Sequence, residues 1–150
     1  MNLTYSGTET IPAPKQTVWT FITDPAKIAA CMPDLISSKI IDVRRFDAVV
    51  GVAVGLVRGK FTFHVTLDPK PASDHLDMKI TGGGFGSVVD LIASADVAEA
   101  DGGTTLAWTG SATMRGPVAT VGGRVIDAQA KRVIETTFAN VKSRVTSATV

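Results

Sequence analysis

The sequence predicts an α+β domain in which a curved, antiparallel sheet of seven strands wraps around a long C-terminal helix. Three observations lead to this prediction. Runs rich in Val, Ile, Thr and Phe follow one another from residue 37 to residue 114 with period-two alternation. The breaks between them are short enough for hairpins, which makes the sheet antiparallel. Beyond residue 117 the apolar period becomes helical, and one late helix is the expected cover for the apolar face of the sheet.

The N-terminal part predicts one strand followed by two short helices. Residues 3–11 alternate between apolar and polar positions, and Pro12 and Pro14 end this strand. An apolar stripe at three-to-four spacing follows in the segment VWTFI and predicts the first helix. Asp24 then precedes a proline, the pattern of an N-cap with proline at the first helical position, so a second helix is expected over residues 25–31.

The remaining strands are placed by alternation and by glycine or aspartate breaks. The expected strand ranges are 37–44, 48–57, 60–68, 75–82, 87–99 and 104–114. The expected breaks are 45–47, Gly59, 69–74, 83–86 and 101–103. Side chains of a strand point alternately to its two faces. By this rule the residues expected to face inward are Phe61, Phe63, Val65 and Leu67, then Leu76, Met78 and Ile80, and then Leu106, Trp108, Gly110, Ala112 and Met114.

The last helix is expected to begin beyond Pro117 and to run to near the end of the chain. A helix of about thirty residues would be about 45 Å long. Gly122 and Gly123 would then lie inside it, each at a cost of about 1 kcal/mol relative to alanine. We therefore expect a local reason for this pair, either a close approach to the sheet or a hinge.

Composition bounds the kind of protein. The 150 residues fit one domain, 1–150, and 45% of them are apolar, which is enough for a full core. Fifteen Lys and Arg against fourteen Asp and Glu leave a net charge of +1, which predicts no nucleic-acid partner. Cys31 is the single cysteine, so no internal disulfide forms. No export or membrane-spanning pattern is visible, and we expect a cytoplasmic protein.

Three segments of the chain resemble the CoxG family of carbon monoxide dehydrogenase subunits, a branch of the START-like (SRPBCC) superfamily. They are ETIPAPKQTVWTFITDPAKIAACMPD, VAVGLVRGKFTFHVTL and GGRVIDAQAKRVIETTFANVKSRV. The more specific features are Cys31-Met32-Pro33, the Val-Gly-x-Val-x-Gly-x-Phe pattern at 54–61, and Gly-Arg-Val-Ile-Asp at 123–127. The resemblance implies a helix-grip fold (START/Bet v 1-like) whose sheet and helix enclose a cavity.

The same resemblance implies a function. It points to a non-catalytic protein that binds a quinone or lipid-like molecule beside a molybdenum hydroxylase of the carbon monoxide dehydrogenase type. Recruitment to the inner face of the membrane or to its quinone is implied as well. Two features depart from the family pattern. Glu9 stands where an aromatic is common, and the sequence ends at Val150 without the linker and apolar tail of longer members, so a membrane anchor is not carried over.

The inward residues predict an apolar small-molecule ligand, because they provide shape without a general acid or base. We expect no catalytic residues, no metal ligands and no required cofactor. Phe85 lies in a glycine-rich hairpin and is a candidate gate, and Gln129 is a candidate donor to a ligand carbonyl. Each predicted residue could instead be plain core, because pockets and cores share composition. The candidate ligand-binding residues are Met32, Phe63, Val65, Met78, Phe85, Leu91, Trp108, Met114 and Gln129.

Two other functions stay open at this stage. A polyketide cyclase or dehydratase would need a buried acid, base or oriented hydroxyl, and Tyr5 and Glu9 are the inward candidates on the first strand. A recruitment protein would instead bind the hydroxylase through its outer surface and hold no ligand. Arg58 and Lys60 could meet an acidic partner or lipid headgroups, although a solvated turn is the plainer interpretation. The two histidines, His64 and His75, are expected on the outer face without a role.

Overall fold

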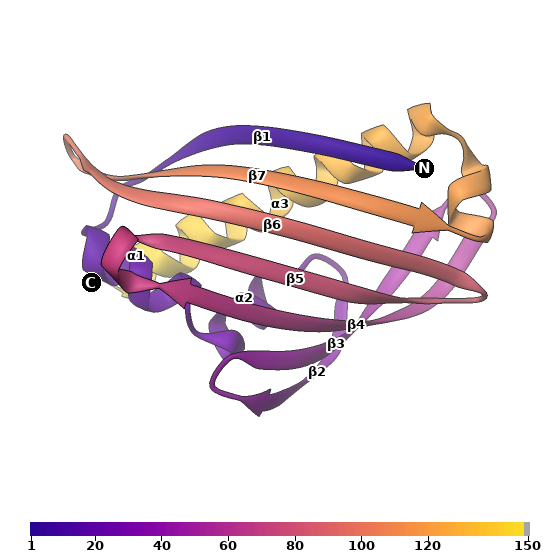
Figure 1. The fold of residues 1–150 in the computed structure, drawn as a ribbon, viewed down its shortest axis with the longest axis horizontal. Coiled ribbons are helices and arrows are strands. Elements are labelled where there is room, and N and C mark those ends of the chain that lie inside the picture. Colours follow the sequence, from indigo (N-terminus) through magenta and orange to yellow (C-terminus); the bar gives the residue numbers. More distant parts are fainter. Residues whose placement is uncertain (149–150) are drawn as a thin grey trace.

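One curved sheet and one long helix make up most of the molecule (Figure 1). A computed structural model describes residues 1–148. In chain order the elements are β1 (Asn2–Ile11), α1 (Lys15–Ile22), α2 (Pro25–Cys31), β2 (Leu35–Asp42), β3 (Arg45–Val54), β4 (Val57–Lys70), η1 (Pro71–Ser73), β5 (His75–Gly84), β6 (Ser87–Ala100), β7 (Gly103–Arg115), η2 (Pro117–Val121) and α3 (Gly123–Ala148).

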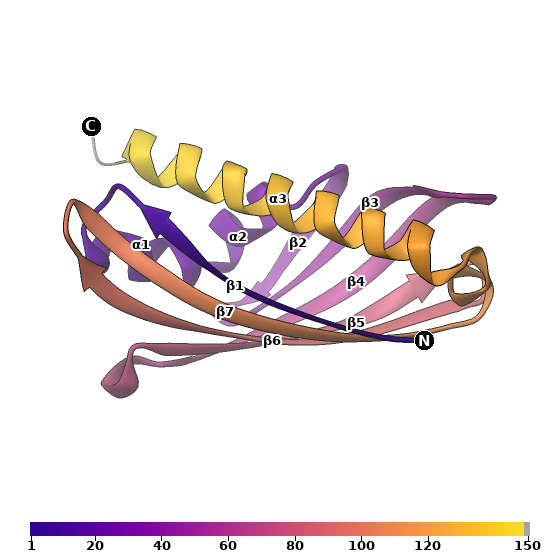
Figure 2. The same cartoon turned by 90° about the horizontal axis from the view of Figure 1, so that it is seen from above.

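All neighbouring strands of the sheet pair antiparallel. The strand order is β1-β7-β6-β5-β4-β3-β2, so β2 to β7 form a meander and β1 closes the sheet against β7. Seen from above, α3 crosses the concave side of the sheet, and α1 and α2 lie under the C-terminal half of α3 (Figure 2). The predicted seven-stranded antiparallel sheet, wrapped around a long C-terminal helix, is confirmed.

The two short helices begin and end where local chemistry favours it. The Asp24 carboxylate accepts a hydrogen bond from the backbone N–H of Ala26 at 3.0 Å, and Pro25 occupies the first turn of α2. Thr23 ends α1, and its hydroxyl donates to the backbone oxygen of Trp19 at 2.7 Å. The N-cap that the sequence predicted is confirmed.

Two of the predicted turns lie elsewhere. Gly59 was expected to break the chain, but β3 and β4 are joined by Gly55 and Leu56. Gly55 has a φ of +58° at the first position of this two-residue turn, which is where hairpins favour glycine. Gly59 is part of β4, and it is a glycine for another reason. The ring of Phe85 occupies the space that a Cβ atom on Gly59 would need.

The turn between β2 and β3 is likewise shifted. It was expected at residues 45–47, but it lies at Val43 and Arg44, and β3 begins at Arg45. The Asp42 carboxylate accepts the backbone N–H of Arg44 at 2.9 Å and the Nε–H of Arg45 at 2.8 Å, which fixes the turn at this place. Such side-chain turns compete with strand pairing and are not visible in the alternation.

The glycine pair near the last helix was also placed wrongly by the sequence. Residues 117–121 form the separate 3-10 helix η2, and Gly122 joins it to α3 with a φ of +107°. α3 starts only at Gly123, and its 26 residues span about 39 Å. Neither glycine therefore interrupts the helix, and the expected interior cost and hinge do not apply.

Candidate functional site

Buried side chains form two separate clusters at the two ends of the sheet. The first contains residues of α1, α2 and the C-terminal half of α3, together with the adjoining strand ends. The second surrounds Phe61, Val89, Val118 and Ile126, near the start of α3. Met32 and Leu35 are partly buried and contact both clusters.

Between the two clusters, the inner face of the sheet is apolar and partly accessible. On β6, Val89 and Val97 are buried, whereas Leu91, Ala93 and Ala95 between them are only half-buried. The same change occurs along β7 beyond Leu106 and along β5 beyond Leu76. The inner-face side chains under α3 are therefore buried at both ends of the sheet and only half-buried in its middle. We call this region the inner space; Met78, Ile80, Leu91, Ala93, Gly110 and Ala112 face it.

The strands at the middle of the inner space, which we call its floor, carry small residues. Ala93 pairs with Gly110, and the next pairs on either side are Leu91 with Ala112 and Ala95 with Trp108. A Cβ atom added to Gly110 would meet nothing closer than a backbone oxygen at 4.0 Å. The sequence signal for this floor is the run of alternate small residues on two adjacent strands, which our prediction did not use.

Five of the predicted lining residues face α3 from neighbouring strands and are half-buried. They are Phe63, Met78, Leu91, Trp108 and Met114. Leu91 contacts neither buried cluster, which places it in the middle of the inner space. Met32 approaches from the end of α2.

The other three predicted residues lie away from the inner space or at its edge. Val65 is only 2% exposed and belongs to the first cluster. Phe85 is 62% exposed at the β5–β6 turn, with a φ of +54°. Gln129 is half-buried, and its side-chain oxygen accepts a hydrogen bond from Nε of Arg132 at 3.3 Å, at the edge of α3.

Trp108 carries a buried hydrogen-bond donor. Its indole lies against Gly7 of β1, where a Cβ atom would come within 3.1 Å of the ring nitrogen, and against the ring of Phe138 on α3, with centroids 5.4 Å apart. The indole N–H is closed off from solvent and has no hydrogen-bond partner among the residues described. Gly7 is thus the position on β1 that leaves room for this side chain.

Tyr5 and Glu9, the candidate catalytic groups, point inward as predicted but are both engaged by α3. The Tyr5 hydroxyl donates to Asp127 at 2.6 Å, and burial together with this carboxylate raises the pKa of Tyr5 to about 12. Glu9 pairs with the ammonium group of Lys142 at 2.9 Å. These two contacts tie β1 to α3 on either side of Gly7, and the raised pKa of Tyr5 keeps its hydroxyl from acting as a base near neutral pH.

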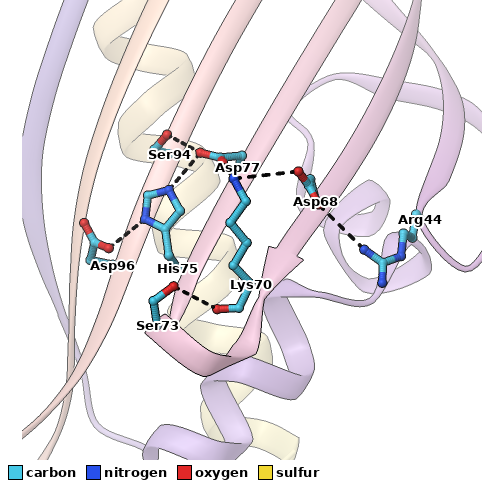
Figure 3. Close-up of polar contacts among 8 residues, drawn as sticks. All are labelled: Arg44, Asp68, Lys70, Ser73, His75, Asp77, Ser94 and Asp96. Atoms are coloured by element: carbon cyan, nitrogen blue, oxygen red, sulfur yellow. Dashed lines mark hydrogen bonds and ion pairs between the residues drawn. The ribbon is translucent and has the colours of Figure 1, made fainter.

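A polar network that the sequence did not predict lies on the outer face of the sheet (Figure 3). One ring nitrogen of His75 lies 2.7 Å from Asp96 and the other 2.8 Å from Asp77. Ser94 donates to Asp77 rather than to the histidine, so the group is not a nucleophile and base pair. Hydrogen bonds from Lys70, Ser94 and His75 hold the pKa of Asp77 well below its usual range. The network is a set of charge pairs across β4, β5 and β6.

We expect His75 to make stability depend on pH. Asp96 and then Asp77 favour the imidazolium and raise the pKa of His75 above 6.5. A raised folded-state pKa adds stability that is complete below the unfolded-state value and is lost as pH rises through the folded value. The difference in unfolding free energy between wild type and His75→Asn should therefore be largest below about pH 6.5 and shrink above it. Urea unfolding across this range measures it; a difference that stays constant with pH contradicts the assignment.

Within residues 1–148, no group of three or more His, Cys, Asp or Glu side chains is placed to hold a metal ion. No helix in this part of the chain is long and apolar enough to cross a membrane. Two hollows on the outer surface lie away from the inner space. One is bordered by residues 12–15, 99–100 and 102–103, and the other by the last turns of α3.

Comparison with solved structures agrees with the architecture. A conserved protein from Geobacillus kaustophilus superposes with a TM-score of 0.86 at 24% identity, covering 97% of both chains. A START superfamily protein from Mycobacterium smegmatis gives 0.72 at 14% identity, covering 97% of this chain and 98% of the other. The Zhui aromatase/cyclase from Streptomyces sp. R1128 gives 0.71 at 16% identity, covering 100% and 97%. At these identities the likeness shows the fold, which is START-like.

Sequence comparison gives the family. None of the curated protein sequences matches the chain significantly. The family model for the CoxG subunit of carbon monoxide dehydrogenase, in contrast, matches residues 7–146, which include the second half of β1, strands β2 to β7 and nearly all of α3. Because this match spans almost the whole chain and the fold is START-like, the protein belongs to the CoxG family of carbon monoxide dehydrogenase subunits.

Proposed function

We propose that this protein binds an apolar small molecule, a quinone or a lipid-like molecule, in the inner space and catalyses no reaction on it. The observation that carries the proposal is the change in burial along the strands. The inner face of β4 to β7 is apolar, with buried clusters at both ends and half-buried side chains between them. An apolar surface of this kind gains free energy when a ligand removes it from water, by about 25 cal/mol for each Å².

Trp108 favours a quinone over a pure hydrocarbon. Its buried indole N–H lacks a partner within the described chain, and an unsatisfied buried donor costs about 1–3 kcal/mol. A carbonyl oxygen that reaches this nitrogen recovers part of that cost, whereas a hydrocarbon offers no acceptor.

The proposed role is that of an accessory protein. The family name is that of a subunit of carbon monoxide dehydrogenase, which supports association with a molybdenum hydroxylase of that type. We place this association in the cytoplasm, at the inner face of the membrane, where quinone is available. A cyclase-like reaction is less well supported because Tyr5 and Glu9 are both engaged by α3.

The test is to identify what the gently purified protein carries, by native mass spectrometry and solvent extraction, and then to titrate it with a menaquinone and with squalene. We expect a stoichiometric quinone or lipid, and tighter binding of the quinone than of the hydrocarbon. Trp108→Phe should weaken quinone binding about tenfold and leave squalene binding nearly unchanged. Trp19→Phe is the matched control, because Trp19 packs on the first cluster away from the floor of the inner space. A protein that binds neither molecule contradicts the proposal.

A further inference from the structure

Three loops meet at the end of the sheet where α3 begins, the right-hand end of Figures 1 and 2. They are the β3–β4 turn, the β5–β6 turn and the connection from β7 through η2 to α3. A Cβ atom on Gly55 would lie 3.0 Å from Val121, and one on Gly86 would lie 3.8 Å from Pro117. We call this end the loop tip and define it as residues 54–60, 84–88 and 115–125.

Large apolar side chains are exposed on the loop tip. Leu56 is 100% exposed at its turn, and Phe85 is 62% exposed at the neighbouring one. Val88 and Val125 are exposed beside them. A turn residue with full exposure contributes nothing to the core, so the fold does not account for leucine at this position.

The loop tip also has an uneven charge. The ranges 48–67, 78–89 and 102–126, which include all of its residues, contain no aspartate or glutamate. Arg58, Lys60 and Arg124 are exposed there, and none of them has an ion-pair partner among the described residues. The nearest acidic residues along the chain are already paired, Asp90 with Arg115 and Asp127 with Lys131.

The other end of the sheet carries charges of both signs. Its turns and adjoining strand ends hold Asp74, Asp96, Glu99 and Asp101, but also Lys70 and Lys15, which pairs with Asp74 at 2.6 Å. The loop tip holds four cations, counting Arg115, and no acid, and the whole chain has a net charge of only +1, so the rest of the chain has a formal net charge of −3. Such a molecule meets an anionic surface with the loop tip first.

We propose that the loop tip is a docking surface for an anionic lipid bilayer, in which Leu56 and Phe85 enter the boundary of the acyl chains and Arg58, Lys60 and Arg124 contact headgroup phosphates. Exposed apolar side chains surrounded by cations are the pattern of interfacial membrane binding. The apolar residues project from separate turns and do not form the broad flat patch expected for a protein partner. The inference specifies the membrane contact of the proposed function, but it requires no ligand in the inner space.

The test uses the whole protein and vesicles of phosphatidylcholine containing about one third phosphatidylglycerol. Wild type should sediment with these vesicles at low salt and detach at about 1 M salt, where the screening length is about 3 Å. The double variant Leu56→Ser, Phe85→Ser should bind at least about tenfold more weakly, and Arg58→Ala about fivefold. Val43→Ser is the matched control, since Val43 is 82% exposed at the β2–β3 turn and lies outside the loop tip.

A labelled variant reports insertion directly. Cys31 is buried and is the single cysteine, so Leu56→Cys and Val43→Cys each offer one accessible thiol for an environment-sensitive dye. The dye at position 56 should shift to the blue with anionic vesicles and the dye at position 43 should not. Equal loss of binding in Val43→Ser, or no binding of wild type to anionic vesicles, overturns the inference. The inference is also overturned if a loop-tip variant no longer binds an acidic protein partner but still binds the vesicles. Titration of quinone in detergent tests the proposed function separately.

Discussion

Replacing Ala93 with phenylalanine is expected to abolish quinone binding, by about a hundredfold or more, while the folded protein stays nearly as stable as wild type. Ala93 lies in the middle of β6, faces α3 and pairs with Gly110. A phenyl ring at this position extends over the glycine into the inner space. Because the side chains around Ala93 are only half-buried, we expect the ring to take the place of the ligand without straining the core.

A second alanine gives the control for this experiment. Ala48 faces inward on β3 and is fully buried in the first cluster. Phenylalanine there should cost about 1–3 kcal/mol of unfolding free energy or more, because a filled core cannot accept extra volume. Urea unfolding and quinone titration of both variants make the comparison. If Ala93→Phe destabilises the protein as much as Ala48→Phe does, the middle of the sheet is packed and the inner space does not exist.

Alanine substitutions of two inward phenylalanines of β4 should distinguish a core position from a ligand-binding position in the same way. Phe61 is 2% exposed in the second cluster, and Phe63, the next inward residue, is half-buried with its ring centroid 6.1 Å away. Phe61→Ala should lower the unfolding free energy by about 3–5 kcal/mol, as truncation of a buried aromatic does. Phe63→Ala should lower it by about 1–2 kcal/mol, because part of its surface stays accessible in the folded protein.

The two variants also differ in the expected effect of ligand. A bound quinone should raise the melting temperature of wild type and of Phe61→Ala by similar amounts, since the second cluster lies outside the inner space. The shift should be much smaller for Phe63→Ala. Differential scanning fluorimetry with and without quinone measures both. Equal stability losses in the two variants, together with equal shifts, would show that Phe63 is an ordinary core residue.

Local sequence patterns were enough to predict the architecture. Alternation assigned the inward faces of β4, β5 and β7 correctly, because every second side chain of a strand must face the same side. Asp24 and the following proline marked the start of α2, because an aspartate side chain accepts a hydrogen bond from a free N–H group of the first helical turn. The positions of two hairpin turns were missed, because the Asp42 side chain and the left-handed conformation of Gly55 fix them and the alternation carries neither signal.

The candidate site depended on more than local pattern. Sequence predicted that Val65 and Leu91 both face inward, but only the folded chain makes the first a core residue and the second part of the inner space. The His75 network, the ties of Tyr5 and Glu9 to α3 and the meeting of three loops at the loop tip likewise join residues far apart in sequence. Period and capping are properties of neighbouring residues, so the sequence by itself determined the elements and their faces. Whether an inward residue is buried in a cluster or half-buried in the middle of the sheet follows from contacts between distant residues, and it was decided only in the tertiary structure.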